Sequence, residues 1–225
     1  MPIKGEGPAT DWREIDRWEG GTGWIAYPKE GMQRASHALF DDGDVWLVDP
    51  VDVEGLDEYL ADFGEVAGVV VLIDRHTRDA GKIARRHGVA VHVPEWMTGV
   101  EENVDAPVER VHGEVGETSY EMHKLIDNAL WQEAFLYDEA SGTLVVAEAL
   151  ATNHFSRTRD ERLGVQVVLR LTPPKRLGRL SPERILVGHG EGILEDAAAA
   201  LREALAGSRR RAPKLWAKNV RELLT

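Results

Sequence analysis

Short apolar runs separated by turn residues fill the first half of the chain. Runs of strand length occupy residues 24–27, 35–40, 45–49, 69–73 and 89–93. The segment Asp41-Asp42-Gly43-Asp44 lies between the second and third runs, and it predicts a tight β-hairpin because Asp and Gly accept positive φ. Helical patterns predict short helices over 56–63 and 79–87, the second ending near Gly88. The order strand, helix, strand over residues 69–93 therefore predicts parallel pairing.

The second half of the chain is again rich in predicted strands and ends in helix. Strand-like runs occupy residues 108–115, 119–125, 133–137, 143–147, 165–171 and 185–187. Residues 193–205 are rich in Ala and Leu, which favour helix, and Gly207 is predicted to end that helix. No low-complexity linker interrupts the chain. We therefore expect residues 1–225 to form one domain built from two similar halves.

Two terminal segments are expected to extend this domain. Residues 1–20 are polar, and the spacing of Trp12 and Trp18 indicates a short turn or helix. Residues 208–225 are expected to form a helical extension. Its amphipathic part, residues 215–224, would pack either on the domain or on a second subunit.

Composition excludes several kinds of site and partner. The chain has no cysteine, which excludes disulfides, zinc–thiolate sites and thiol catalysis. Its formal net charge of −12 makes a general affinity for nucleic acid phosphates unexpected. Arg far outnumbers Lys beside abundant Asp and Glu, a balance that suits a halophile but also follows from a GC-rich genome. The hydrophobic content of 43% and the seven Trp residues indicate a folded protein.

The sequence shows no sign of membrane insertion or export. No apolar stretch approaches the roughly 20 residues that span a bilayer. The first residues lack the apolar segment of a secretory signal. We expect a cytoplasmic protein that contacts neither membrane nor nucleic acid.

Polar residues that could carry chemistry follow three predicted strands. They are the segment Asp74-Arg75-His76-Thr77-Arg78-Asp79, the carboxylate Glu148, and His189 between Gly188 and Gly190. Ligand and metal sites collect beyond the carboxyl ends of buried strands, so these residues are candidates for one site. Each also has a simpler interpretation. The segment 74–79 would be a solvated loop of paired Arg and Asp residues, Glu148 would face water from an edge strand, and His189 would be a structural or exposed His.

With these three points in order, the chain resembles the metallo-β-lactamase superfamily over about residues 21–205. The hairpin and the following Trp46-Leu47-Val48-Asp49 are similar to the family's early strand pair, which ends in Asp. The strand 69–73 leads into the place of its H-x-H-x-D-H signature, and Gly188-His189 resembles its late Gly-His. The resemblance implies an α/β (α+β) fold, a four-layer αββα sandwich of two mixed sheets with one or two metals between them. Most members hydrolyse esters, thioesters, lactams, lactones or phosphodiesters.

The signature is degenerate in this chain. Asp74 stands at the first His, Arg78 at the metal-binding Asp, and Asp79 at the following His, whereas His76 is retained. Asp127-Asn128-Ala129-Leu130-Trp131 occupies the place of a further His, for which His123 could substitute only in another strand register. Glu148 replaces the bridging Asp and is one methylene longer.

Two outcomes remain open for this set of residues. His76, Asp79, Glu148 and His189, with Asp74 in reserve, could hold one divalent metal, zinc first and manganese or iron(II) as alternatives. Alternatively Arg78 replaces the metal as the cation of the site, with bidentate bonds to Asp79 or Glu148.

Three functions follow from these alternatives. The first is a mononuclear metallo-hydrolase of a small ester, thioester or phosphoester, in which Asp79 or Glu148 orients or deprotonates water. The second is a non-catalytic protein with a metal-free cleft for binding or assembly, where Arg75 and Arg78 favour an anionic ligand. The third is metal-independent acid–base catalysis by His76 with Asp74 or Asp79. In each case we expect a small-molecule partner.

Overall fold

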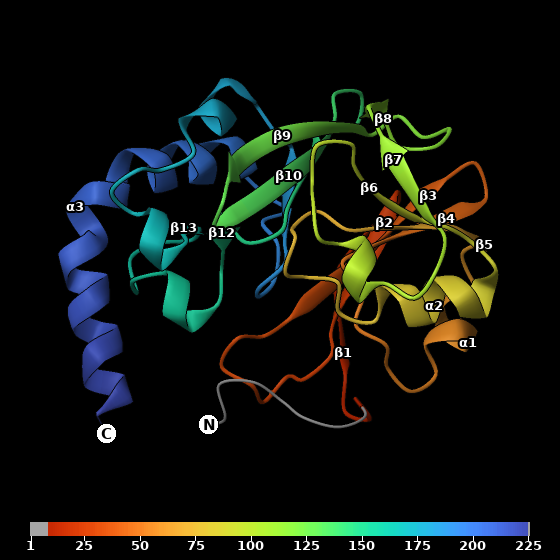
Figure 1. Ribbon diagram of the computed structural model, residues 1–225. Helices are drawn as coiled ribbons and strands as arrows, with labels where there is room; N and C mark the ends of the chain where they lie inside the picture. The colour runs from red at the N-terminus through yellow and green to blue at the C-terminus, as the bar shows by residue number, and fades with distance from the viewer. Residues whose placement is uncertain (1–8, 225) are drawn as a thin grey trace.

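The computed structural model describes residues 9–224, which form two β-sheets with helices on their outer faces (Figure 1). The larger sheet contains, in spatial order, β1 (Arg13–Trp18), β2 (Gly21–Ile25), β3 (Ala35–Asp41), β4 (Asp44–Val48), β5 (Glu65–Val70), β6 (Val91–Pro94) and β7 (Val108–Val111). Strands β1 to β4 pair antiparallel, and β4 to β7 pair parallel. This sheet is therefore mixed, with its parallel half in the region of the predicted strand–helix–strand unit.

The second sheet is also mixed. Its order is β14 (Arg184–Val187), β11 (Thr143–Val146), β10 (Trp131–Asp138), β9 (Glu121–Asn128) and β8 (Gly113–Glu114). Only β11 and β14 run parallel. A separate pair, β12 (Leu150–Ala151) with β13 (Gly164–Val165), lies beyond the end of β11.

Alternating side chains divide the core into layers. In β4, Leu47 packs in a cluster with α1 (Leu56–Leu60) and α2 (Ala80–His87), whereas Val48 packs between the sheets. In β11, Val145 packs between the sheets and Val146 packs with α3 (Ala197–Leu223). Because successive strand residues point to opposite faces, each sheet is covered on both sides. The predicted αββα sandwich is confirmed.

Several predicted elements agree with the structure and others do not. The hairpin turn is confirmed, with φ of 48° at Asp42 and 91° at Gly43. The turn or helix predicted around Trp12 and Trp18 is wrong, because Arg13–Trp18 is the edge strand β1. The long strands predicted over 108–115 and 165–171 are also wrong. The first is divided between β7 and β8, and the second becomes β13 followed by a 3₁₀ turn at Val167–Leu169.

The C-terminal helix is longer than predicted. Helix α3 continues through Gly207 to Leu223, so the predicted end at Gly207 is wrong. Pro213 lies inside it and removes one intrahelical hydrogen bond, a common cause of kinks, and Figure 1 shows that α3 changes direction along its length. Within residues 9–224 no helix is both long and apolar enough to cross a membrane.

Candidate functional site

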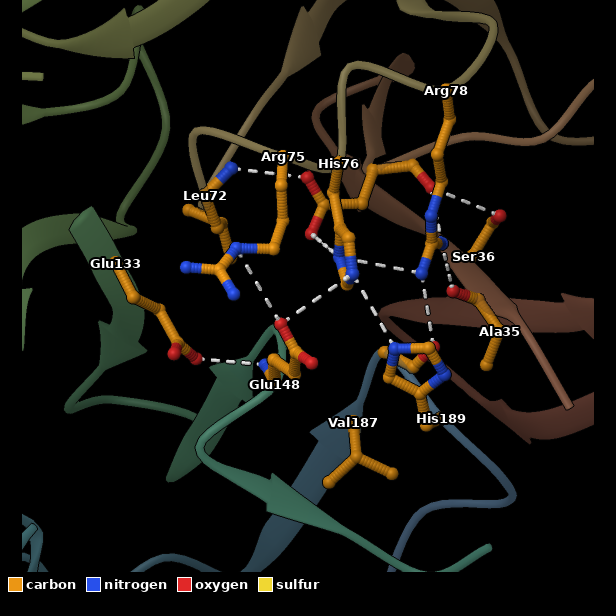
Figure 2. Close-up of polar contacts among 12 residues, drawn as sticks. Ala35, Ser36, Leu72, Arg75, His76, Arg78, Glu133, Glu148, Val187 and His189 are labelled. Carbon is orange, nitrogen blue, oxygen red and sulfur yellow. Dashed lines mark hydrogen bonds and ion pairs between the residues drawn. The ribbon is translucent and has the colours of Figure 1, made fainter. Parts of the chain in front are cut away.

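The candidate residues from both sheets meet where β4, β5, β11 and β14 end (Figure 2). His76 Nε2 lies 3.4 Å from His189 Nε2 and 4.0 Å from Glu148 Oε2. His76 follows β5 in the larger sheet, and the other two residues follow β11 and β14 in the second sheet. The predicted grouping of His76, Glu148 and His189 at strand ends is therefore present in the structure.

Arg78 joins the two sheets at this point. Its Nη1 donates to the carbonyl oxygens of Ala35, at 2.6 Å, and Asp49, at 2.7 Å. Its Nη2 donates to Gly188 O at 3.1 Å and lies 3.4 Å from His76 Nδ1. The expected bidentate pairing with Asp79 or Glu148 is replaced by these main-chain contacts. The backbone of Arg78 has φ of 41°, in the left-handed region that costs free energy for a side chain other than Gly.

The two histidines are buried and differently held. His189 Nδ1 donates to Met32 O at 3.0 Å, which leaves Nε2 as an acceptor when the ring is neutral. Burial, together with the charges of His76 and Arg78, lowers the pKa of His189 well below its ordinary value. A neutral His189 therefore presents a lone pair toward His76.

Glu148 is the carboxylate that approaches this pair. Its Oε2 lies 4.0 Å from Arg75 Nε, and its Oε1 accepts a hydrogen bond of 3.4 Å from Gln166. Burial raises the pKa of Glu148, although the charge of Arg75 opposes this shift. Oε2 itself is buried and has no hydrogen-bond partner among the described residues. This oxygen is thus available to a proton or to a ligand.

The other predicted site residues make contacts elsewhere. Asp79 Oδ2 accepts from the backbone N–H of Asp52 at 2.9 Å, at the start of α2. Asp74 pairs with Arg75 at 3.3 Å, and Arg75 also donates to Leu130 O and lies over the ring of Trp131. These contacts give Asp74 and Asp79 structural partners outside the His76–His189 pair. They also leave the acid–base pairing of His76 with either residue without a contact to support it.

Two buried carboxylates near the site were not predicted to belong to it. Asp49 Oδ2 lies 3.7 Å from His76 Nδ1, and its Oδ1 accepts from Leu72 N. Burial raises the pKa of Asp49 to about 6, against the lowering effect of Arg78. Glu133 accepts from the backbone N–H groups of Glu148 and Ala149 and from Trp131 Nε1. Asp49 could have been recognised as a site residue from the sequence, because it ends the apolar run of β4 as the other candidates end theirs. Glu133 lies within a strand, and no sequence pattern marks it as a site residue.

These residues do not fit a metal centre. In residues 9–224, no three His or carboxylate side chains come together in an arrangement that could hold a metal ion. Catalytic zinc needs three protein ligands at about 2.0–2.2 Å. His76 and His189 lie close enough to share an ion, but Asp74 and Asp79 are engaged elsewhere and Arg78 adds positive charge beside His76.

Comparison with known proteins supports the fold. No protein-family model matches the chain, and no curated protein matches its sequence. Among solved structures, the metallo-β-lactamase DIM-1 exposed to ceftazidime aligns with a TM-score of 0.62 at 15% identity, covering 92% of this chain and 99% of that one. TMB-1 aligns with a TM-score of 0.60 at 14% identity, covering 92% and 98%. The chain has the metallo-β-lactamase fold.

A third solved structure has the same fold at still lower sequence identity. A metallo-β-lactamase from Hirschia baltica aligns with a TM-score of 0.57 at 9% identity, covering 86% of this chain and 98% of that one. Similarity at this level supports the arrangement of layers and strands and carries no assignment of site residues. Function must therefore be argued from the side chains of this chain.

Replacing Glu133 with Gln is expected to change how stability depends on pH. Glu133 is fully buried, which raises its pKa from 4.5 to about 7 although three hydrogen bonds oppose the shift. The folded protein keeps this proton after the unfolded chain has lost it, so the wild-type contribution to stability falls as pH rises from 4.5 to about 7. Gln has no such proton, and the variant should lack this decrease.

Urea unfolding at several pH values across this window measures the effect. Glu117→Gln, at an exposed position with no polar contact in the described residues, is the matched control and should retain the wild-type slope. Equal slopes in Glu133→Gln and the wild type would contradict the raised pKa.

Proposed function

We propose that this protein has a metal-free cleft that binds a small molecule and that it is not a metal-dependent hydrolase. One observation carries the proposal: the Arg78 guanidinium is fixed on three main-chain carbonyls beside His76. A guanidinium stays protonated at physiological pH and repels a divalent cation. Carbonyl contacts from both sheets hold it in place, so the site already contains a permanent cation.

The groups at the edge of the cleft favour a ligand with an anionic part. Arg75 is partly exposed, and among residues 9–224 only its Nε and Nη2 have partners. Its remaining donors are suited to a carboxylate or phosphate oxygen. Glu148, with its raised pKa and unpartnered Oε2, can donate a hydrogen bond when it is protonated. Together they supply polar contacts that need no metal.

A mononuclear metallo-hydrolase of a small ester, thioester or phosphoester is the second candidate. It is favoured by the 3.4 Å between the Nε2 atoms of His76 and His189. Two imidazoles on one tetrahedral zinc, each at about 2.0–2.1 Å, have a similar separation. The candidate lacks a third ligand, because Glu148 Oε2 lies 4.0 Å from His76 Nε2 and Arg78 lies on the other side of that ring.

Metal content separates the two candidates. Protein purified without a metal-affinity tag and then dialysed against zinc or manganese should carry far less than one equivalent by elemental analysis. A chelator should leave its midpoint of thermal unfolding unchanged, since no metal stabilises the folded state. One bound equivalent that is lost in both His76→Ala and His189→Ala would reject the metal-free proposal. Metal that persists in both variants would lie outside this cleft.

A further inference from the structure

A basic groove lies beside the cleft and is not explained by the proposed function. It is formed by the loop 152–162 and the C-terminal part of α3, and it contains three adjoining cavities of about 500, 260 and 580 Å³. The 500 and 260 Å³ cavities share Gln33, Thr152 and Arg157. The 500 and 580 Å³ cavities share Thr158, Arg159 and Lys218. The cavities are therefore parts of one continuous groove.

The charge of this groove is opposite to that of the whole chain. The chain has a net charge of −12, yet the 500 Å³ cavity is lined by His154, Arg157, Arg159 and Lys218 and by no acidic residue. The 580 Å³ cavity adds Lys214 and Arg221 from α3, again without a carboxylate. Positive charge is thus concentrated in a concave region of an acidic protein, which attracts anions locally.

Carboxylates near the groove are already paired with other cations. Asp160 pairs with Lys214 at 2.7 Å, Glu222 pairs with His154 at 2.8 Å, and Glu191 pairs with Arg13 at 2.7 Å. His154, Lys214 and Glu191 themselves line the groove, so these pairs offset part of its positive charge but involve none of Arg157, Arg159 and Lys218.

Arg157, Arg159 and Lys218, which line the 500 Å³ cavity, have no carboxylate partner among the described residues. Arg157 Nη1 donates to the carbonyls of Glu161 and Arg162, and Lys218 Nζ donates to the carbonyls of His154 and Arg157. Arg159 is exposed and makes no hydrogen bond or ion pair among residues 9–224. The carbonyl contacts fix the positions of Arg157 and Lys218 but do not neutralise their charge.

We propose that this groove binds a phosphoryl-bearing small molecule, with Arg157, Arg159 and Lys218 contacting the phosphate oxygens. Three clustered cations match a multiply charged phosphate or diphosphate better than a single carboxylate. Arg donors suit the geometry of phosphate oxygens, and Lys supplies a compact point charge. The negative charge of the rest of the chain disfavours a long polyanion, whose flanking phosphates would be repelled.

The groove is separate from the cleft in its side chains but adjacent to it in space. Gln33 O accepts from the backbone N–H of Gly190 at 2.8 Å, and Thr152 N donates to His189 O at 3.0 Å. None of the residues that line the groove is His76, Arg78, Glu148 or His189. The proposal therefore does not depend on whether the cleft binds metal. Its test substitutes residues other than those that test the proposed function.

Isothermal titration calorimetry with inorganic pyrophosphate, at fixed ionic strength, tests the proposal. The wild type should bind, and Arg159→Ala, which removes a charge-assisted contact to phosphate, should bind about tenfold more weakly, a loss of about 1.4 kcal/mol. Arg159→Glu should abolish detectable binding. Arg202→Ala is the matched control: Arg202 is exposed on α3, has no polar partner in the described residues, and lies outside the groove lining. It removes the same charge and should leave affinity unchanged.

Three results would overturn the proposal. The first is that the wild type gives no binding heat with pyrophosphate, although it is folded and unfolds at the same temperature as Arg159→Ala. The second is an equal loss of affinity in Arg202→Ala, which would indicate general attraction to the whole surface. The third is tighter binding of a short single-stranded DNA oligonucleotide with the same dependence on Arg159, which would identify a nucleic acid surface.

Discussion

Replacing Arg78 with Met is expected to lower the free energy of unfolding by about 3–5 kcal/mol, the range for removing one partner from a buried charged network. Met keeps the unbranched stem of the side chain but has no guanidinium to donate to the carbonyls of Ala35, Asp49 and Gly188. A hydrogen bond to a charged group contributes about 1.5–3 kcal/mol, and three are lost, although Asp49 O and Gly188 O keep second donors in Ser36 Oγ and Ala35 N. The variant also retains the left-handed backbone of this position without the contacts that hold it. Urea unfolding measures the loss.

Arg75→Met is the matched control for this substitution. Arg75 lies three residues earlier in the same loop, its side chain is 40% exposed, and its ion pair with Asp74 is at the surface. Exposed pairs of this kind contribute about 0–1 kcal/mol, so the control should remain close to wild type. If Arg78→Met were as stable as Arg75→Met, Arg78 would not be a fixed structural cation. The metal-free proposal would then lose the observation on which it depends.

The layered fold could be predicted because buried strands leave a clear pattern. Strands covered on both faces, such as β4 and β5, appear as continuous apolar runs. Strand β1 leaves no such pattern, since Ile15 is the only buried residue in it and the other five are partly or fully exposed. Gly207 was misinterpreted for a different reason. It is buried inside α3 and lacks the positive φ of a Gly that ends a helix, so the helix continues through it.

The candidate site could be predicted in its position but not in its bonding. Strand ends placed His76, Glu148 and His189 together, because parallel strands bring their carboxyl ends to one edge. The partners of Arg78 are the main-chain carbonyls of Ala35, which begins β3, and of Asp49 and Gly188, which follow β4 and β14, and no residue pattern encodes them. Asp79 was expected at the site, yet it binds the backbone of Asp52. Residue type indicates which side chains can ligate, whereas the local backbone decides where each one points.

Replacing Arg170 with Leu is expected to have a similarly large effect on the loop beside the basic groove. Arg170 is fully buried and pairs with Glu161 at 2.6 Å, and it also donates to the carbonyls of Val165 and Ser156. The variant leaves Glu161, which is 5% exposed, as a buried carboxylate whose remaining cation, Arg211, lies 3.8 Å away. Removing one partner of such a pair costs about 3–5 kcal/mol. Arg179→Leu, at an exposed position without a polar partner in the described residues, is the control.

The pH dependence of unfolding gives a second readout of the same pair. Burial acts to raise the pKa of Glu161, but hydrogen bonds from Arg170 and Thr158 outweigh it and hold the pKa below its ordinary value. In the wild type this carboxylate therefore contributes stability above pH 4.5 that is lost as pH falls through its folded pKa. Arg170→Leu removes the largest effect that lowers this pKa, so the pKa of Glu161 should rise and the loss of stability at low pH should be smaller than in the wild type.

A double variant distinguishes a buried charge from lost packing. Arg170→Leu with Glu161→Leu removes both charges, and replacing a whole buried pair with apolar residues is often neutral or stabilising. The double variant should therefore recover most of the stability lost in Arg170→Leu. Its free energy of unfolding should show neither the pH dependence of the wild type nor that of Arg170→Leu, because Glu161 is absent. It should still bind pyrophosphate more weakly, because Thr158 loses its bonds to Glu161 and the loop carrying Arg157 and Arg159 is no longer held. A double variant no more stable than Arg170→Leu would show that the loop depends on the carbonyl contacts of Arg170, and not on its ion pair.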